Sequence, residues 1–272
     1  MRLMDIGINL MNPSYDKDRE DIIREAAAAG ITPLIISPSG EEESLNAAIY
    51  AANYNRENPG ALYSKAGIHP HDAKNFTKDS MGFFRELIRG QLCETIAAIG
   101  ECGLDYNRDF SPRDAQRLCF SSQAELASEL GLPIFLHERD SFEDFSAILK
   151  EHIGGLKASV VHCFTGNGDQ LDFYLSLGCY IGITGWICDN KRGLHLRDLI
   201  KKIPKERLML ESDGPYLLPK NMEKKPKNNR NEPKFLHYIL ETAAACLNKE
   251  PEILAEETYS NSLRFFGIVK QQ

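Results

Sequence analysis

The stretch TIAAIGECGLDYNRDFSPRDAQRLCFSSQAELASELGLPIFL, residues 95–136, decides the fold. It opens with the apolar run 95–99 and closes with the apolar run 133–136, and Gly or Pro bounds both runs, which is typical of buried strands. Between them, apolar residues recur at helical spacing over 112–130. Ser111 is placed to cap this helix, Pro112 suits its first turn, and Gly131 suits its end. The stretch therefore predicts a strand, a helix and a second strand.

The same alternation runs through the chain. Strand candidates lie at residues 3–8, 33–36, 62–68, 95–99, 133–136, 159–161, 179–183 and 207–210. Further clear helical patterns lie at 16–29, 168–177 and 234–247. Eight strands that alternate with helices over 272 residues predict an α/β fold, a (β/α)8 TIM barrel that forms a single domain over residues 1–272. An open doubly wound sheet is the alternative, but no G-x-G-x-x-G motif follows any of these runs.

Composition limits the compartment and the partners. The formal net charge of −7 gives no overall positive field, so a nucleic-acid partner would need a local basic patch or bound cations. The seven cysteines are an odd number without C-x-x-C spacing, which argues against a disulfide framework or a zinc knuckle. No export signal or apolar stretch of membrane-spanning length is present in the sequence. We therefore expect a cytoplasmic protein with no membrane partner.

Ionisable residues follow most of the strand candidates, at the edge where a parallel barrel places its catalytic groups. They are His69, His71, Glu101, His137, His162, Glu211 and Asp213. A single histidine at such a position is more often a hydrogen-bonded structural residue than a ligand. Several imidazoles and carboxylates gathered at one mouth, however, are best satisfied together by a divalent cation. This pattern predicts a metal site.

The residue types leave the metal open at this point. Histidine nitrogen with carboxylate oxygen suits Zn²⁺, Mn²⁺ or Fe²⁺, whereas Mg²⁺ prefers oxygen ligands and retains several waters. Cys102 and Cys163 each stand beside a candidate ligand and therefore on the alternate strand face, so we expect both to pack in the core.

Several motifs resemble the TatD family of metal-dependent deoxyribonucleases, within the wider metal-dependent hydrolase superfamily. In chain order they are DIGINL, GIHPHD, AIGECGLDYNRDFSPRDAQ, PIFLHERDSFED, HCFTG, YIGITGW, IPKERLMLESDGPYLLP and NRNEP, and they cover nearly the whole chain. The resemblance implies that Glu101, His137, His162 and Asp213 form the metal site. It also implies that Glu101 can bridge two ions, that Asp213 orients or deprotonates the attacking water, and that His69 lies near the scissile phosphate.

The resemblance further implies a 3′–5′ exonuclease that cleaves phosphodiester bonds at the 3′ ends of single-stranded DNA or RNA. Mg²⁺ or Mn²⁺ is the expected cofactor, with Zn²⁺ as a further candidate and one or two ions bound. No obligatory protein partner is expected.

The first strand departs from the wider superfamily. Many relatives carry His-x-His there as ligands to a second ion, and this chain has Gly7 and Asn9, as does the branch it resembles. Glycine has no side-chain ligand and asparagine offers only a neutral amide oxygen, so this half of the site is expected to bind weakly. Asp5 and Asn9 are accordingly weak candidates for ligands.

Further candidates concern the substrate. Arg139, two residues after His137, is expected either to bind a phosphate or to pair with a nearby acid. Trp186, the one tryptophan, is either a stacking platform for an unpaired base or a packing anchor. The basic segment 220–230 follows the last strand, and Arg230 at its end is a candidate substrate contact, with a solvated surface loop as the alternative.

Two rival functions use the same features. A hydrolase of small esters, lactones or amides on the same barrel would use similar metal chemistry but would not need the basic segment. A metal-dependent protein that binds nucleic-acid ends without turnover is the other rival, and the absence of the first-strand histidine pair favours it.

Overall fold

A parallel barrel is the framework of the computed structural model, which describes residues 1–269. The sheet of these residues has eight strands in the order β1 to β8, and every neighbouring pair is parallel. The strands are β1 (Leu3–Ile8), β2 (Ile31–Ile36), β3 (Leu62–Ala66), β4 (Ile96–Asp105), β5 (Ile134–Arg139), β6 (Ser159–Val161), β7 (Tyr180–Ile183) and β8 (Leu208–Leu210). A parallel bridge between Ile8 and Gly214 joins the first strand to the segment after the last and closes the ring. The predicted barrel is confirmed.

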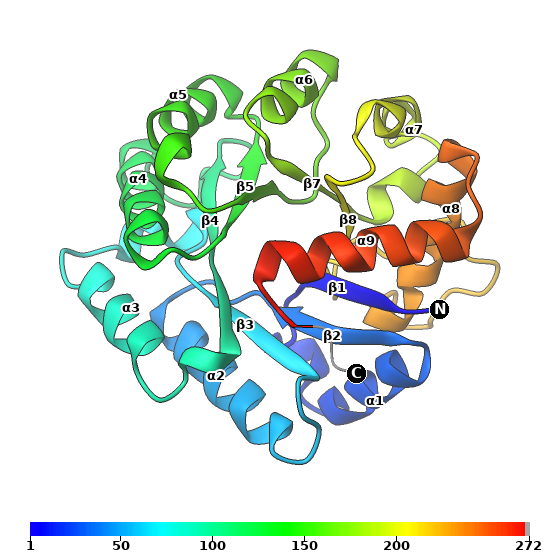
Figure 1. Cartoon of the computed structure of the whole chain (residues 1–272), viewed down its shortest axis with the longest axis horizontal. Coiled ribbons are helices and arrows are strands. Elements are labelled where there is room, and N and C mark those ends of the chain that lie inside the picture. The colour runs from blue at the N-terminus through cyan, green and yellow to red at the C-terminus, as the bar shows by residue number, and fades with distance from the viewer. Residues whose placement is uncertain (270–272) are drawn as a thin grey trace.

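Helices surround the ring of strands, as Figure 1 shows. They are α1 (Arg19–Ala28), α2 (Glu41–Asn55), α3 (Ser80–Arg89), α4 (Arg113–Leu130), α5 (Phe142–His152), α6 (Gly168–Ser176), α7 (Leu194–Leu199), α8 (Leu236–Leu247) and α9 (Pro251–Phe266). The four helices predicted from the sequence are present, with ends shifted by zero to three residues. At the end of α4, Gly131 takes a left-handed conformation with φ 63°, as predicted for a terminating glycine.

The start of α4 differs from the prediction. Ser111 does not cap the helix, because Pro112 occupies the N-cap position and no side chain caps it. The Ser111 hydroxyl instead donates to the His71 carbonyl at 2.7 Å and accepts from the Lys74 amide at 3.0 Å. It therefore ties the turn after β3 to the loop before α4. A second difference is that β4 continues from the predicted run to Asp105, so Glu101 lies within the strand rather than after it.

Apolar side chains fill the barrel interior, and α9 covers its amino-terminal end. In Figure 1 the helix lies across the centre of the ring. Phe265 on α9 is buried and its ring lies 5.3 Å from that of Tyr180, at the start of β7. Phe265 belongs to the same cluster as Ile6, Phe135 and Met209. The helix therefore excludes water from the amino-terminal end of the barrel. The carboxyl ends of the strands remain open for a site.

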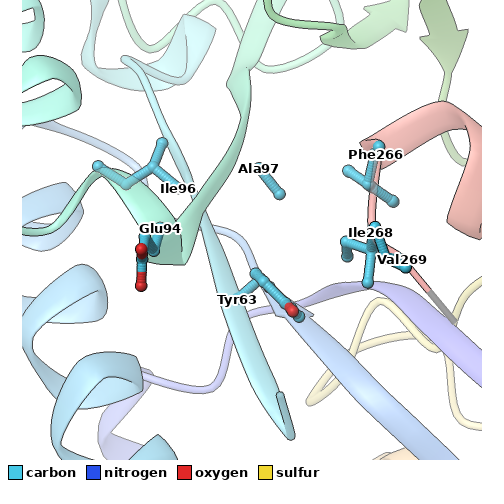
Figure 2. Close-up of a pocket in the computed structure, with 8 residues that line it drawn as sticks. Tyr63, Glu94, Ile96, Ala97, Phe266, Ile268 and Val269 are labelled. Atoms are coloured by element: carbon cyan, nitrogen blue, oxygen red, sulfur yellow. The ribbon is translucent and has the colours of Figure 1, made fainter. Parts of the chain in front are cut away.

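A hollow of about 630 Å³ lies at this covered end (Figure 2). Its lining combines the starts of β3 and β4 with the segment that ends α9, and it includes Tyr63, Ile96, Phe266 and Val269. Glu94 is its charged lining residue. Because these residues are at the amino-terminal ends of the strands, the hollow lies at the opposite end of the barrel from the predicted chemistry.

No helix within residues 1–269 has the length and apolar content needed to cross a membrane.

Replacement of Phe265 tests the role of α9 as a cover. Phe265→Ala should lower the free energy of unfolding by about 3–5 kcal/mol, because it leaves a cavity against Tyr180 and the barrel interior. Urea denaturation followed by circular dichroism measures this loss. Leu118→Ala, at a position that is 60% exposed, is the control and should cost less than about 1 kcal/mol. A loss of similar size in both variants would contradict the assignment.

Candidate active site

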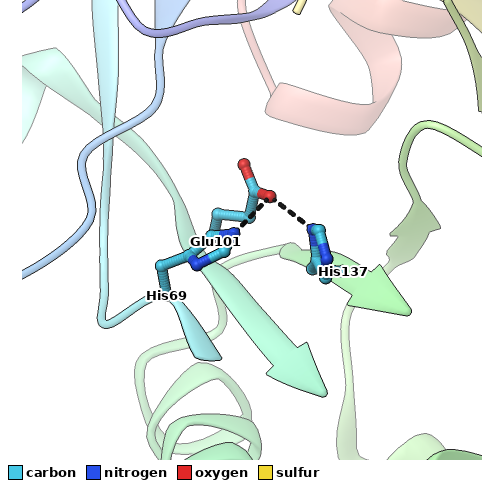
Figure 3. Close-up of side chains that lie close together, drawn as sticks. All are labelled: His69, Glu101 and His137. Carbon is cyan, nitrogen blue, oxygen red and sulfur yellow. Dashed lines mark hydrogen bonds and ion pairs between the residues drawn. The ribbon is translucent and has the colours of Figure 1, made fainter. Parts of the chain in front are cut away.

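Three imidazoles converge on one oxygen of Glu101 at the carboxyl end of the barrel. Glu101 Oε1 lies 2.7 Å from His162 Nε2, 2.9 Å from His137 Nδ1 and 3.3 Å from His69 Nε2. His137 is on β5, whereas His69 and His162 follow β3 and β6. Figure 3 shows His69 and His137 on either side of the carboxylate. The barrel thus brings together residues that are up to 93 positions apart in the sequence.

Two glycines allow Glu101 to approach its neighbours. Gly100 and Gly103 have φ values of 135° and 139°, which side chains rarely permit. A Cβ at Gly100 would lie 2.5 Å from the Phe135 carbonyl oxygen, and one at Gly103 would lie 2.0 Å from the His137 carbonyl oxygen. The absence of side chains at Gly100 and Gly103 therefore lets β4 pack closely against β5.

The charges of this cluster are strongly coupled. Burial alone would raise the pKa of Glu101, but the His162 charge and hydrogen bonds from the three imidazoles hold that pKa well below its usual value. Burial opposes the charge on His162 as well, and Glu101 and Glu211 outweigh it and raise the pKa of His162 to about 10. In the protein alone, a proton on His162 therefore supplies positive charge that the carboxylates require.

The donor atoms that meet at Glu101 fit a divalent cation. His137 Nδ1 and His162 Nε2 lie 3.1 Å apart and face the same carboxylate oxygen. Their other ring nitrogens are buried without a hydrogen bond, and each lies near a carboxylate, His137 Nε2 3.5 Å from Asp105 and His162 Nδ1 3.4 Å from Glu211. A carboxylate behind the distal nitrogen is the usual second-shell arrangement of a metal-ligating histidine. The donor set of nitrogen and carboxylate oxygen suits a divalent cation.

His69 differs from the other two histidines. Its Nδ1 accepts a hydrogen bond from the His71 amide at 3.1 Å, so the proton of the neutral ring lies on Nε2, which faces Glu101. Burial lowers the pKa of His69 to about 4, so the ring is neutral at pH 7. Although His69, Glu101 and His137 are close enough to surround one ion, this tautomer makes His69 a hydrogen-bond donor toward the site.

Asp213 follows β8 and lies within electrostatic reach of the cluster. Burial raises the pKa of Asp213 to about 7, the His162 charge opposes that rise, and the Glu101 charge adds to it. The Asn9 side-chain Nδ2 donates to Asp213 Oδ1 at 3.3 Å. Asp213 is therefore a carboxylate whose protonation state depends on the positive charge beside it.

The model of the family described as TatD related DNase matches residues 4–267. The chain belongs to this family. It is 46% identical over 266 residues to the 3′-5′ ssDNA/RNA exonuclease TatD of a Rahnella strain, with 98% of each chain covered. It is 44% identical to the protein of the same name from Dickeya dadantii, with 97% of each chain covered.

Solved structures of TatD-family proteins share the fold. The TatD homologue YJJV from Escherichia coli K12 superposes with a TM-score of 0.86 at 25% identity, over 98% of this chain and 99% of that one. A hydrolase of the TatD family from Entamoeba histolytica gives a TM-score of 0.84 at 27% identity, over 98% of each chain. The resemblance noted in the sequence is confirmed.

Position 7 of this TatD-family chain is a glycine for a steric reason. A Cβ at Gly7 would lie 2.6 Å from Glu211 Oε2 and 3.2 Å from Phe135 Cζ. A Cβ at Gly182 would lie 2.6 Å from Glu211 Oε1. The buried Glu211 carboxylate therefore occupies the space between the two glycines, where it also accepts from the Cys163 amide at 2.6 Å. Sequence reasoning noted Glu211 at a strand end but not this role.

Asp5 is engaged in closing the barrel. It accepts from the Ser212 amide at 2.9 Å and the Gly7 amide at 3.2 Å, and the Ser212 hydroxyl donates to its other oxygen. Burial raises the pKa of Asp5 to about 7, and these hydrogen bonds act in the opposite direction. Asp5 thus joins β1 to the segment after β8.

The other predicted residues are Arg139 and Trp186, as candidate substrate contacts, and Cys102 and Cys163, as packing residues. Arg139 ends β5, and its guanidinium has no hydrogen bond or ion pair among residues 1–269. The Arg192 guanidinium stacks 4.3 Å from the Trp186 ring. Cys102 is buried in the core, and burial raises the pKa of its thiol well above the usual value, as expected for a packing residue. Cys163, also predicted to pack, is only partly buried, and its sulfur contacts the Thr184 hydroxyl at 3.5 Å.

The Arg230 guanidinium, a predicted substrate contact, already has partners within the protein. It donates to Asp18 at 2.6 and 2.9 Å, to Glu232 at 2.7 Å and to the Ser14 carbonyl at 2.6 Å. Arg230 therefore anchors the end of the basic segment to the N-terminus of α1, and a substrate phosphate would have to displace these partners.

Gly7→His tests the steric account of the missing first-strand ligand. We expect the variant to lose about 1–3 kcal/mol of unfolding free energy and to gain no metal equivalent, because the new side chain must displace Glu211. Denaturant unfolding and Mn²⁺ titration measure the two effects. Asn9→His is the matched control and should be the less destabilised variant. A stable Gly7→His protein with an added ion would contradict the account.

Proposed function

We propose that this protein is a divalent-metal-dependent 3′–5′ exonuclease that hydrolyses single-stranded DNA or RNA. One observation carries the proposal: His137, His162 and Glu101 direct three donor atoms to one point at the barrel mouth of a TatD-family chain. The names of the relatives with 41–46% identity support the substrate class and the polarity.

Glu101, His137, His162 and Asp213 would hold the ion, and we assign Mg²⁺ or Mn²⁺ as the cofactor. When bound, the cation supplies Lewis acidity that withdraws charge from a phosphoryl oxygen and acidifies water. The carboxylates behind His137 and His162 hold the two imidazoles in their ligating orientations. Positive charge at this point also keeps Asp213 ionised, since burial alone favours its protonated form.

The residues around this point can perform a hydrolysis. Asp213, once ionised, accepts the proton of the attacking water. His69 presents its Nε2 proton toward the site and can donate it to a phosphate oxygen. Arg139, which has no protein partner among residues 1–269, offers two parallel N–H groups to the same phosphate.

A pocket of about 310 Å³ supports a strand-binding role for the loops after β7 and β8. Trp186, Arg192, Lys220 and Lys225 contribute to its lining. Lys220 is paired with Asp189 at 2.7 Å, whereas Lys225 is exposed and unpaired within the described chain. An aromatic ring beside an unpaired lysine suits a base and a phosphate of a single strand.

The activity test uses one single-stranded oligonucleotide in two labelled forms. With Mg²⁺ or Mn²⁺, the 5′-labelled form should shorten stepwise, and the 3′-labelled form should release its label as a mononucleotide in the first turnover. Chelator should abolish both reactions and added Mn²⁺ should restore them. Intact oligonucleotide together with cleavage of a small ester would favour the rival hydrolase, and retention of intact oligonucleotide in a gel shift would favour the rival binding protein.

Loss of one carboxylate tests the residue assignment. Glu101→Gln and Asp213→Asn should each lower kcat/KM on single-stranded DNA by about a thousandfold or more, because each removes a negative charge from the ion site. Glu94→Gln, a matched change of an exposed glutamate at the opposite end of the barrel, should leave kcat/KM unchanged. Near-native activity of both site variants, with unaltered circular dichroism, would refute the assignment.

A further inference from the structure

Lys65 is a buried lysine inside the barrel that the reaction described above does not use. It lies within β3, and its side chain is 0% exposed. Among residues 1–269 it is the one lysine classed as buried. The sequence gives only a weak signal of its position, a lysine within an apolar run.

The contacts of Lys65 do not neutralise its charge. Its Nζ donates to the Ile6 carbonyl oxygen on β1 at 3.1 Å, so the side chain reaches across the interior past β2. The same atom lies 3.2 Å from the centroid of the Phe135 ring on β5. No carboxylate lies within 4.0 Å of it in the described chain. A buried ammonium without an ionic partner is costly unless other charges compensate for it.

The compensating charges belong to the acids of the barrel mouth. Burial lowers the pKa of Lys65 to about 8, and attraction to Glu101, Glu211, Asp5 and Asp213 opposes that fall. The side chain is therefore still mostly protonated at pH 7. Phe135, whose ring faces Lys65, also stacks 4.8 Å from the ring of His162. The ammonium thus lies one aromatic ring away from a candidate metal ligand.

We propose that Lys65 is a charge-compensating residue of the metal centre, a buried cation near the acids that supplies part of the positive charge a second ion would otherwise supply. This inference rests on the metal site of the proposed function. Gly7 and Asn9 provide poor ligands for a second ion, yet four acids at the mouth, Glu101, Glu211, Asp5 and Asp213, act electrostatically on Lys65. Lys65 supplies one positive charge from within the fold and weakens the attraction of the acids for further divalent ions.

The experiment compares Mn²⁺ binding by metal-stripped wild-type protein, Lys65→Met and Lys65→Gln by isothermal titration calorimetry at pH 7. Methionine keeps the shape of the side chain without the charge, and glutamine keeps a donor for the Ile6 carbonyl without the charge. We expect both variants to bind Mn²⁺ about tenfold more tightly than wild type, or to bind one more equivalent, because the site gains one unit of net negative charge. Lys157→Met removes the same charge from an exposed position and should bind like wild type.

The outcomes separate this inference from the proposed function. If Lys65→Met and Lys65→Gln bind Mn²⁺ with the same affinity and stoichiometry as wild type, the role of Lys65 is overturned and the metal site is left intact. The same holds if Lys65→Gln binds like wild type and only Lys65→Met differs, since the hydrogen bond would then be the cause. Absence of binding by all the proteins would overturn the metal site and this role together. If a variant is too unstable for calorimetry, the rise in its Tm on Mn²⁺ addition is measured instead. This rise should be larger for the variant than for wild type.

Discussion

Buried negative charge at one end of the barrel is the constraint on which the rest of this structure depends. The acids there are Asp5, Glu101, Asp105, Glu211 and Asp213, and all but Asp213 are almost completely inaccessible to solvent. Carboxylates in such a place must be protonated, hydrogen-bonded or paired with cations. Each of these solutions is present: backbone and hydroxyl donors hold Asp5, imidazoles surround Glu101, and burial favours the protonated form of Asp213. A divalent ion at the mouth and Lys65 inside the barrel would supply the remaining positive charge that these acids require.

The shape of the site depends on four glycines, because a side chain at any of these positions would collide with a neighbour. Gly7 and Gly182 leave space for the carboxylate of Glu211, while Gly100 and Gly103 let β4 approach β5 so that Glu101 meets His137. The absence of a side chain at position 7 and the place of the buried Glu211 carboxylate therefore belong to one packing arrangement. A side chain at position 7 would have to displace the Glu211 carboxylate from this place.

The sequence predicts the barrel because strand and helix signals depend on local periodicity, and it predicts the cluster because parallel strands in a ring must gather their carboxyl ends. Glu101, His137 and His162 follow from that rule together with the family motifs. Other features depend on neighbours that are distant in the chain. Ser111 has a capping side chain, yet its hydroxyl bonds to the turn after β3. Arg230 belongs to a basic segment, yet Asp18 and Glu232 bind it. No local pattern indicates that Glu211 fits between two glycines or that Lys65 lies over Phe135.

An acidic protein that binds a polyanion must place its positive charge locally. The net charge of −7 repels nucleic acid at long range, and the Debye length of about 8 Å at physiological salt limits that repulsion to short distances. On the loops after β7 and β8, Lys224, Lys225 and Lys227 are exposed without ion pairs in the described chain, and Arg192 covers one face of Trp186. Arg230 contributes indirectly, because its pairing with Asp18 fixes the end of the segment that carries these lysines. Electrostatic attraction for a polyanion is therefore concentrated on the loop after β8, which favours binding of a strand there over binding along the rest of the surface.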